Sequence, residues 1–313
     1  MPTAVKSSRL GRRARKPPAP AARPGIGDPW SLASRSGLEV LELAPFKRLP
    51  WLVHGFSTRT GGVSRPGPGE PVSNLGFTEW DTRKAVLENR RAFQSALGAS
   101  HLRLVPLGQF HSSLVHFFAA APSLPAKGDA ALTGVAGLLL AVQTADCVPV
   151  LLVDPKKRVV AAVHAGWRGT LARIAEKTVG EMRKRLRSDP ADLLAAIGPS
   201  IGSCCYEVGT ELVTQFASQF ADAEDWFDEL RTGDEPNPLQ WLNRMPPGHQ
   251  PPPKKVRLDL PRANRAQLLA AGVAGRNIFS SGLCTACHPD LFFSYRKEGQ
   301  QSGRLMSVIG IRP

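Results

Sequence analysis

Two apolar runs in the middle of the chain each lead into side chains that can take part in chemistry. The run Leu138–Val142 leads into Asp146 and Cys147, and the run Val159–Val163 leads into His164. Short apolar runs bounded by turn signals are typical of buried strands. A buried strand gains no stability from a carboxylate, a thiol or an imidazole at its end. These residue types on adjoining strand ends therefore indicate a functional site.

A third strand end supplies a second imidazole. The segment Leu102–Gly108 is predicted as a strand, and His111 follows it closely. Together, His111, Cys147 and His164 offer two imidazoles and one thiolate, a ligand set that leaves the fourth position of a tetrahedral zinc ion for water. Zinc lowers the pKa of such a water towards neutrality, and Asp146 can orient a ligand histidine or carry a proton. The residues predict a catalytic zinc site, which copper can also enter because it binds nitrogen and sulfur ligands more tightly.

The same residues allow a second interpretation that needs no metal. Cys147 can serve as a nucleophile, and His164 can serve as its base. A cysteine hydrolase or amidase of this kind has no use for His111 beyond orienting the base. The two interpretations therefore differ in the role of His111.

The remaining cysteines form two short motifs. The string Cys284-x-x-Cys287-His288 matches the attachment motif of c-type haem, but haem attachment requires export and no secretory signal is visible. Cys204 and Cys205 are adjacent and lack the spacer of a zinc knuckle. We therefore expect neither motif to hold haem or a metal. Five cysteines without a disulfide pattern favour a reducing compartment, so we expect a cytoplasmic protein.

Half of the excess positive charge is concentrated at the start of the chain. The formal net charge is +14, and the first 27 positions hold no acidic residue but seven basic ones, Lys6, Arg9, Arg12, Arg13, Arg15, Lys16 and Arg23. Because this Pro-, Ala- and Arg-rich stretch cannot form a core, we expect residues 1–36 to be a disordered tail. Any contact with nucleic acid is expected from this tail alone. No apolar run reaches the roughly 18 residues that a membrane span needs, so no membrane contact is expected.

The rest of the chain, residues 37–313, is expected to form one catalytic domain. Strands are predicted at Gly37–Leu43, Trp51–Phe56 and Leu193–Ile197, and helices at Asp81–Leu97, Thr170–Arg187, Gly209–Ala221 and Pro261–Ala271. Asp81 is expected to cap its helix, and Arg90 is expected to be solvated. Residues 223–255 are rich in proline and contain Trp226 and Trp241, so we expect a long surface insertion.

Seven strings along the chain carry a family resemblance. They are HGFSTRTGGVS, QFHSS, TADCVPVLL, VHAGWRGT, IGPSIGSCCYEVG, LDLPRANRAQL and CTACHPDLFFSYRKEG. Together they resemble the YfiH family, which is also called the laccase-domain or multicopper polyphenol oxidase family and the peptidoglycan editing factor family. The resemblance covers about residues 38–311. It implies an α+β fold of mixed β-sheets packed together with flanking helices, similar to the catalytic domain of cytotoxic necrotising factor.

The resemblance also implies an activity. Members of the family are described as purine nucleoside phosphorylases that act on adenosine, inosine, guanosine and methylthioadenosine, and that also deaminate adenosine. Their metal ligands fall on His111, Cys147 and His164. Deamination needs a metal-activated water aimed at C6 of the purine and a carboxylate that moves protons, and we assign the carboxylate to Asp146.

Nucleoside and phosphate must also be bound. Phosphate needs a cationic or amide-rich cradle, for which the candidates are Arg59, Arg168 and the glycine-rich loop that contains Gly198 and Ser200. Candidates for stacking on the base are Tyr206, Phe293 and Tyr295.

The other family names are weighed against the same residues. A multicopper oxidase needs many imidazoles, usually in His-x-His pairs, to hold four coppers, whereas this chain has seven histidines and no such pair. Copper-dependent polyphenol oxidation is therefore disfavoured. The cell-wall editing name fits the metal-free cysteine hydrolase, which would act on cell-wall peptides and stays open as the alternative.

Overall fold

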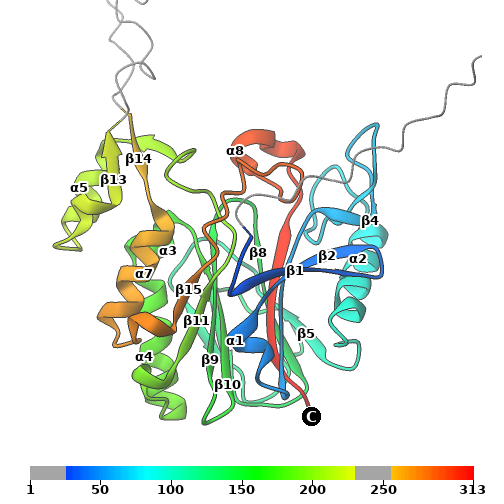
Figure 1. The fold of residues 1–313 in the computed structure, drawn as a ribbon, viewed down its shortest axis with the longest axis horizontal. Helices are drawn as coiled ribbons and strands as arrows, with labels where there is room; N and C mark the ends of the chain where they lie inside the picture. Colours follow the sequence, from blue (N-terminus) through cyan, green and yellow to red (C-terminus); the bar gives the residue numbers. More distant parts are fainter. Residues whose placement is uncertain (1–25, 230–254) are drawn as a thin grey trace, which may run out of the picture.

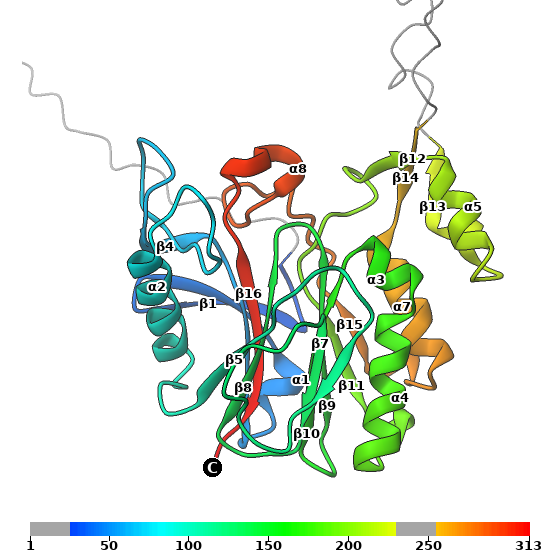
Figure 2. The same cartoon turned by 180° about the vertical axis from the view of Figure 1, so that it is seen from behind.

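Two six-stranded sheets pack face to face at the centre of the molecule (Figures 1 and 2). The computed structural model describes residues 26–229 and 255–313. The first sheet has the order β1 (Trp30–Arg35), β2 (Leu38–Leu43), β3 (Leu52–Ser57), β16 (Leu305–Ile311), β8 (Leu138–Thr144), β5 (Arg103–Pro106). The second has the order β15 (Ile278–Ser280), β11 (Leu194–Ile197), β9 (Val148–Asp154), β10 (Val159–Ala165), β7 (Ala130–Thr133), β6 (Val115–Phe117). Both contain parallel and antiparallel pairs, which confirms the predicted mixed sheets.

The central strands are apolar along their whole length because both of their faces are covered. All seven residues of β9 are buried. Val150 and Leu152 pack into the cluster beneath the helices, whereas Leu151 and Val153 pack into the cluster between the two sheets. Alternate residues of a strand face opposite sides, so a strand inside a layered core needs a continuous apolar run.

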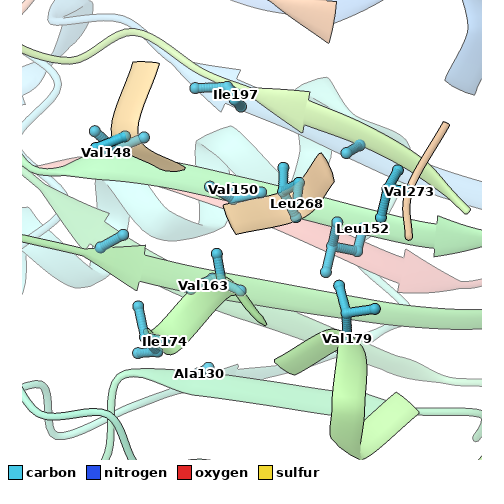
Figure 3. Packing of buried hydrophobic residues seen from close by; sticks show 14 of the residues in the cluster. Ala130, Val148, Val150, Leu152, Val163, Ile174, Val179, Ile197, Leu268 and Val273 are labelled. Atoms are coloured by element: carbon cyan, nitrogen blue, oxygen red, sulfur yellow. The ribbon is translucent and has the colours of Figure 1, made fainter. Parts of the chain in front are cut away.

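Helices cover the outer faces of both sheets and complete a helix–sheet–sheet–helix arrangement (Figure 1). On the second sheet, α4 (Ile174–Leu186) and α7 (Leu260–Ala270) bring Val179 and Leu268 against Val150 and Leu152 (Figure 3). On the first sheet, α2 (Arg83–Ala96) contributes Phe93 to the cluster that contains Val308. This architecture confirms the predicted α+β class with flanking helices. None of the helices in the described ranges is long and apolar enough to cross a membrane.

The smaller elements lie around this core. They are α1 (Ala44–Lys47), β4 (Thr60–Ser64), α3 (Trp167–Leu171), α5 (Glu211–Ala217) and α8 (Tyr295–Glu298). A third, three-stranded sheet has the order β12 (Glu207–Gly209), β14 (Lys255–Leu258), β13 (Phe227–Glu229).

The predicted disordered tail, residues 1–36, extends too far along the chain. Residues 30–35 form β1, which pairs with β2 in antiparallel register. Trp30 is only 6% exposed, and its ring meets Phe56 edge-on with centroids 5.4 Å apart. The expectation of disorder is therefore wrong for residues 30–35. Residues 1–25 lie outside the described residues.

The surface insertion predicted over residues 223–255 begins too early in the chain. Ala223–Trp226 forms a 3₁₀ turn, and Phe227–Glu229 forms β13. Trp226 is 2% exposed and packs on Phe220, with ring centroids 4.9 Å apart, so it belongs to the core. Residues 230–254, which include Trp241, lie outside the described residues.

Two predicted helices differ in detail. The helix expected over Thr170–Arg187 is broken at Arg173, whose φ of 62° ends α3 before α4 begins. The cap of α2 is Thr82 rather than Asp81, because the Thr82 side chain accepts from the amide of Ala85. Arg90 is buried rather than solvated, and its Nε donates to the carbonyl of Leu75.

Candidate metal centre

The structure brings the three predicted ligands together. Cys147 lies between β8 and β9, His164 is the next-to-last residue of β10, and His111 follows β5 in the loop towards β6. The Nε2 atom of His111 lies 3.7 Å from Sγ of Cys147, and the two imidazole rings are 5.0 Å apart at their centroids. One donor atom from each residue lies within 4.8 Å of the others. This spacing allows all three to bind one ion.

A carboxylate that the sequence interpretation missed orients the site. Asp129 is fully buried just before β7, and its Oδ1 accepts from Nδ1 of His164 at 2.8 Å. The same carboxylate accepts from the backbone amides of His111 at 3.0 Å and Ser112 at 2.6 Å. With Nδ1 engaged, His164 presents Nε2 to an ion, the arrangement that usually supports a metal-bound histidine.

The backbone around the ligands is shaped for close approach. His111 and Asp146 have φ values of 63° and 90°, in a region that side chains other than glycine seldom adopt. Gly166 follows β10, and a Cβ there would lie 2.8 Å from His111 and 3.1 Å from Cys147 Sγ. A side chain at position 166 would therefore fill the space between the ligands. Unusual backbone of this kind is concentrated at functional sites.

The charges of the site are coupled. Burial would raise the pKa of Cys147, but the charge of His164 and the hydrogen bond from His111 outweigh it and lower the pKa to about 6. Burial would lower the pKa of His164, but Cys147 and Asp129 raise it to about 9. For Asp129, hydrogen bonds from His164 and Ser112 overcome burial and hold its pKa well below the usual range. Without a metal, Cys147 and His164 thus form a thiolate–imidazolium pair.

Asp146 has a different place from the one expected for an orienting carboxylate. Its Oδ1 accepts from Oγ1 of Thr285 at 2.7 Å, and its Oδ2 accepts from the amide of Arg296 at 2.7 Å. Asp129, not Asp146, orients His164. Asp146 still borders the same pocket as Cys147, so proton transfer is the role that remains open to it.

The ligands open into a pocket of about 580 Å³, within the usual size range of small-molecule sites. Its lining includes all three ligands, Asp146, the side chains Gln109 and Gln143, the aromatic residues Phe77, Trp167, Tyr206 and Tyr295, and the arginines Arg168, Arg296 and Arg304. Trp167 and Arg168 come from α3, and Tyr295 and Arg296 come from α8, two helices in the upper half of the molecule in Figure 1. Cations and aromatic rings therefore surround the candidate metal centre.

Of the predicted phosphate-binding residues, the structure brings only Arg168 to the pocket. Arg59 does not line it. Its Nη1 pairs with Oε1 of Glu298 at 2.7 Å and donates to the carbonyl of Pro289 at 3.0 Å. Arg59 therefore braces the end of α8 instead.

The glycine-rich loop is also not a phosphate cradle. Ser200 is 2% exposed, and its amide donates to Leu283. A Cβ at Gly198 would collide with the ring of Phe56, so Gly198 serves close packing. The loop packs against the core, and of residues 198–202 only Ile201 reaches the pocket.

Of the three aromatic residues predicted to stack on the base, two line the pocket and one does not. Tyr206 and Tyr295 line the pocket, whereas Phe293 is fully buried with the guanidinium of Arg59 4.6 Å from its ring centroid. Phe293 is therefore a core residue. Two pocket arginines, Arg296 and Arg304, were not predicted. Arg296 follows Tyr295 directly, and Arg304 follows Gly303 directly, so a cation next to an aromatic residue or a glycine was the available signal.

Comparison with known proteins identifies the family. Residues 53–312 match the family described as multi-copper polyphenol oxidoreductase laccase. The chain belongs to this family. Among its relatives, the chain is 36% identical to a protein of Geobacillus stearothermophilus named purine nucleoside phosphorylase YlmD, over 83% of this chain and 90% of that protein. It is 39% identical to an adenosine deaminase from an unknown prokaryotic organism, over 86% of this chain and 98% of that protein.

The solved structures agree with this membership. The hypothetical protein YfiH of Bacillus licheniformis aligns with a TM-score of 0.76 at 29% identity, over 91% of this chain and all of that one. The resemblance to the YfiH family is thereby confirmed, together with its fold. In this laccase-type family the chain offers a His–Cys–His centre, whose donors suit zinc or copper.

Proposed function

We propose that the protein is a zinc-dependent purine nucleoside phosphorylase that also deaminates adenosine. The observation that carries the proposal is the centre of His111, Cys147 and His164, oriented by Asp129, beside a pocket lined by arginines and aromatic rings. The names of the relatives point to the same chemistry. The substrates we expect are adenosine, inosine, guanosine and methylthioadenosine, with phosphate.

His111, Cys147 and His164 would hold the zinc ion. When bound, zinc supplies Lewis acidity and an activated water. The three residues fit because two imidazoles and one thiolate are borderline-soft donors, and because Gly166 leaves the space between them open. Copper can enter the same set, since it binds these donors more tightly.

Arg168 is our candidate for binding phosphate. It is exposed on α3, stacks on Trp167 at 4.3 Å, and has no hydrogen-bond or ion-pair partner within residues 26–229 and 255–313. A guanidinium can bind two phosphate oxygens at once. In phosphorolysis, a phosphate oxygen forms a bond to C1′ of the ribose while the bond from C1′ to the purine nitrogen breaks. Arg168 would hold the attacking phosphate in place.

Aromatic side chains would hold the base. Tyr206 and Tyr295 line the pocket, with the guanidinium groups of Arg296 and Arg304 at 5.2 and 5.7 Å from their ring centroids, and Trp167 and Phe77 also border it. Flat rings of this kind stack on purines without reading their substituents closely. This fits an enzyme that accepts several purine nucleosides.

Asp146 is our candidate for moving protons in deamination. Water must add at C6 of adenosine and ammonia must leave, so a proton passes from the attacking oxygen to the amino group. Asp146 lies next to Cys147 in the chain and lines the pocket. Thr285 and the amide of Arg296 hold its carboxylate in one orientation.

The test combines metal analysis with product analysis. The protein is prepared without chelator, its zinc and copper are measured, and adenosine and inosine are supplied with and without phosphate. The proposal expects zinc at the His–Cys–His centre, free base from inosine only when phosphate is present, and inosine from adenosine without phosphate. A zinc-loaded protein that leaves both nucleosides unchanged would overturn it.

A second candidate function rests on the thiolate–imidazolium pair. Cys147 with a pKa near 6 and His164 with a pKa near 9 are set for nucleophilic attack if no metal is bound. A cysteine hydrolase acting on cell-wall peptides would give one covalent adduct with a thiol reagent at Cys147 and would need no zinc.

Copper-dependent polyphenol oxidation stays disfavoured because the chain has too few histidines for a multicopper cluster. All five cysteines are free, which suits the reducing cytoplasm.

A further inference from the structure

Four cysteines that the sequence interpretation set aside lie together in space. Sγ of Cys287 lies 3.5 Å from Sγ of Cys204 and 3.4 Å from Sγ of Cys205. With Cys284, the four sulfur atoms all lie within 4.8 Å of one another. The expectation that these motifs hold no metal was based on the missing spacer between Cys204 and Cys205. The structure supplies the second pair from a segment about 80 residues further along the chain.

Two tight turns bring the sulfurs to a common point. In one, the amides of Cys205 and Tyr206 both donate to the carbonyl of Gly202. In the other, the amide of Cys287 donates to the carbonyl of Cys284 at 3.2 Å. The amide of Gly202 also donates to Sγ of Cys284 at 3.3 Å, across the two turns. Amide donors directed at sulfur stabilise a thiolate, the form in which cysteine binds a metal.

The arrangement favours a shared ion over a disulfide. A disulfide joins two cysteines, yet Cys287 is almost equally close to Cys204 and Cys205, and Cys284 is gathered with them. A tetrahedral zinc ion with four bonds of about 2.3 Å places its sulfurs about 3.8 Å apart. The observed spacing brackets that value.

The haem interpretation of the same string does not fit. Covalent haem attachment needs both cysteines and the histidine to face the haem, but Cys284 is 6% exposed. His288 directs Nδ1 to the carbonyl of Cys284 at 2.9 Å. The Cys284–His288 turn is therefore built around its own backbone and the neighbouring sulfurs.

We propose that Cys204, Cys205, Cys284 and Cys287 bind a structural zinc ion as a tetrathiolate site. Four protein ligands close the coordination sphere, so this ion takes no part in chemistry and joins two loops instead. The site is separate from the His–Cys–His centre and does not depend on the nucleoside activity.

The loops that this zinc would join also position Asp146. Oγ1 of Thr285, next to Cys284, donates to Asp146 Oδ1, and the amide of Ile201 donates to the Asp146 carbonyl at 2.9 Å. Two backbone hydrogen bonds join the loops: the amide of Ser200 donates to the carbonyl of Leu283, and the amide of Thr285 donates to the carbonyl of Ser200. A metal that fixes both turns therefore also fixes the carboxylate beside Cys147 and the pocket residue Tyr206.

The first test measures zinc in the full-length protein, purified under reducing conditions without chelator. Wild-type protein should hold two zinc ions per chain, and His111→Ala, which removes a ligand of the other centre, should hold one. X-ray absorption at the zinc edge of His111→Ala should show four sulfur neighbours at about 2.3 Å. Wild-type protein should show an average of about 2.5 sulfurs and one imidazole nitrogen per zinc, because one site has one sulfur and the other has four.

The second test removes a ligand of the proposed site. Cys287→Ser should lower the zinc content from two to one per chain, and the ion that remains should show one sulfur neighbour. Ser203→Ala, a change beside Cys204 in the other turn that removes no ligand, is the control and should keep both ions. If Cys287→Ser fails to fold, the spectrum of the wild-type protein still decides, since it needs no variant.

Three results would overturn the proposal. They are a His111→Ala protein without zinc, zinc in that variant with fewer than four sulfur neighbours, and a disulfide between any two of these cysteines in the reduced preparation. A loss of nucleoside turnover with two zinc ions retained would count against the proposed function and leave the tetrathiolate site standing.

Discussion

At the scale of single residues, the centre depends on two buried carboxylates with different tasks. Asp129 accepts hydrogen bonds from His164 and from the backbone around His111, so it fixes two ligands at once. The carboxylate of Asp146 accepts its hydrogen bonds from Thr285 and Arg296 instead of from either histidine. One carboxylate therefore acts on the metal ligands, and the other faces the pocket.

Replacing these carboxylates should separate the two tasks. Asp129→Asn cannot accept every hydrogen bond that the carboxylate accepts, so the affinity of the His–Cys–His centre for zinc should fall about 10- to 100-fold. Asp146→Asn should keep the zinc but lose most deamination. Competition with a chelator measures the affinity, and product analysis measures the activity. Equal zinc affinity in wild-type protein and Asp129→Asn would show that Asp129 does not support the ligands.

A glycine substitution tests the space between the ligands. Gly166→Ala puts a methyl group 2.8 Å from His111 and 3.1 Å from Cys147 Sγ, so the variant should fold but lose the zinc of this centre. Gly180→Ala is the matched control, because nothing lies within 4 Å of its Cβ inside α4. It should keep the metal and raise the free energy of unfolding by about 0.5–1 kcal/mol. Full zinc in Gly166→Ala would mean that the ligands lie further apart when metal is bound.

At the scale of elements, a buried histidine joins β2 to β3. Nε2 of His54 accepts from the amide of Leu43 at 2.9 Å, which requires the neutral imidazole. Burial lowers the pKa of His54 to about 4; Glu42 opposes this, and Lys47 and Arg35 add to it. Glu42 is itself paired with both of these cations.

The lowered pKa of His54 makes the free energy of unfolding depend on pH in a predictable direction. The unfolded chain binds the proton of His54 at about pH 6.5, whereas the folded chain binds it only near pH 4. The free energy of unfolding is therefore undiminished above pH 6.5 and falls as the pH drops from 6.5 towards 4. Between pH 7 and pH 5, wild-type protein should lose about 2 kcal/mol more than His54→Gln. Denaturant unfolding at both pH values measures this, and parallel losses would assign the effect to other groups.

An element could be predicted when its own residues carry the pattern, and it was missed when its burial depends on contacts with distant segments. The strands β9 and β10 were predictable because burial on both faces requires continuous apolar runs. β1 was missed because half of the residues in its sequence, WSLASR, are polar, and only Trp30 is buried while Leu32 packs partly against the core. Trp226 was misplaced because proline nearby suggested a surface loop, whereas the contact with Phe220 decides its position.

Some residues of the candidate site could likewise be found from the sequence, and others only from the fold. Its three ligands follow apolar runs and could be found from the chain alone. Asp129 could not, because its role comes from the pairing of β7 with β10, which joins residues 35 positions apart. The four cysteines escaped notice for the same reason, since their two turns meet only in the folded chain.

At the scale of the whole molecule, the basic start of the chain and the fold should separate at position 26. Removing residues 1–25 takes away seven positive charges, from +14 to +7, and leaves β1 intact. This truncation should melt as the full chain does, keep its nucleoside turnover and lose any binding to duplex DNA at low salt. Removing residues 1–36 deletes β1 and Trp30, so its melting temperature should fall by about 5–10 °C. Equal melting of the two truncations would show that β1 adds nothing to the first sheet.

The most direct measurement follows zinc and turnover together in His111→Ala, with His101→Ala, an exposed histidine, as its control. The zinc interpretation predicts that His111→Ala holds one zinc fewer per chain than wild-type protein and loses phosphorolysis and deamination in parallel, while His101→Ala matches wild type in both. His111→Ala that keeps its nucleoside turnover would contradict the three-ligand centre and return Cys147 and His164 to the metal-free hydrolase.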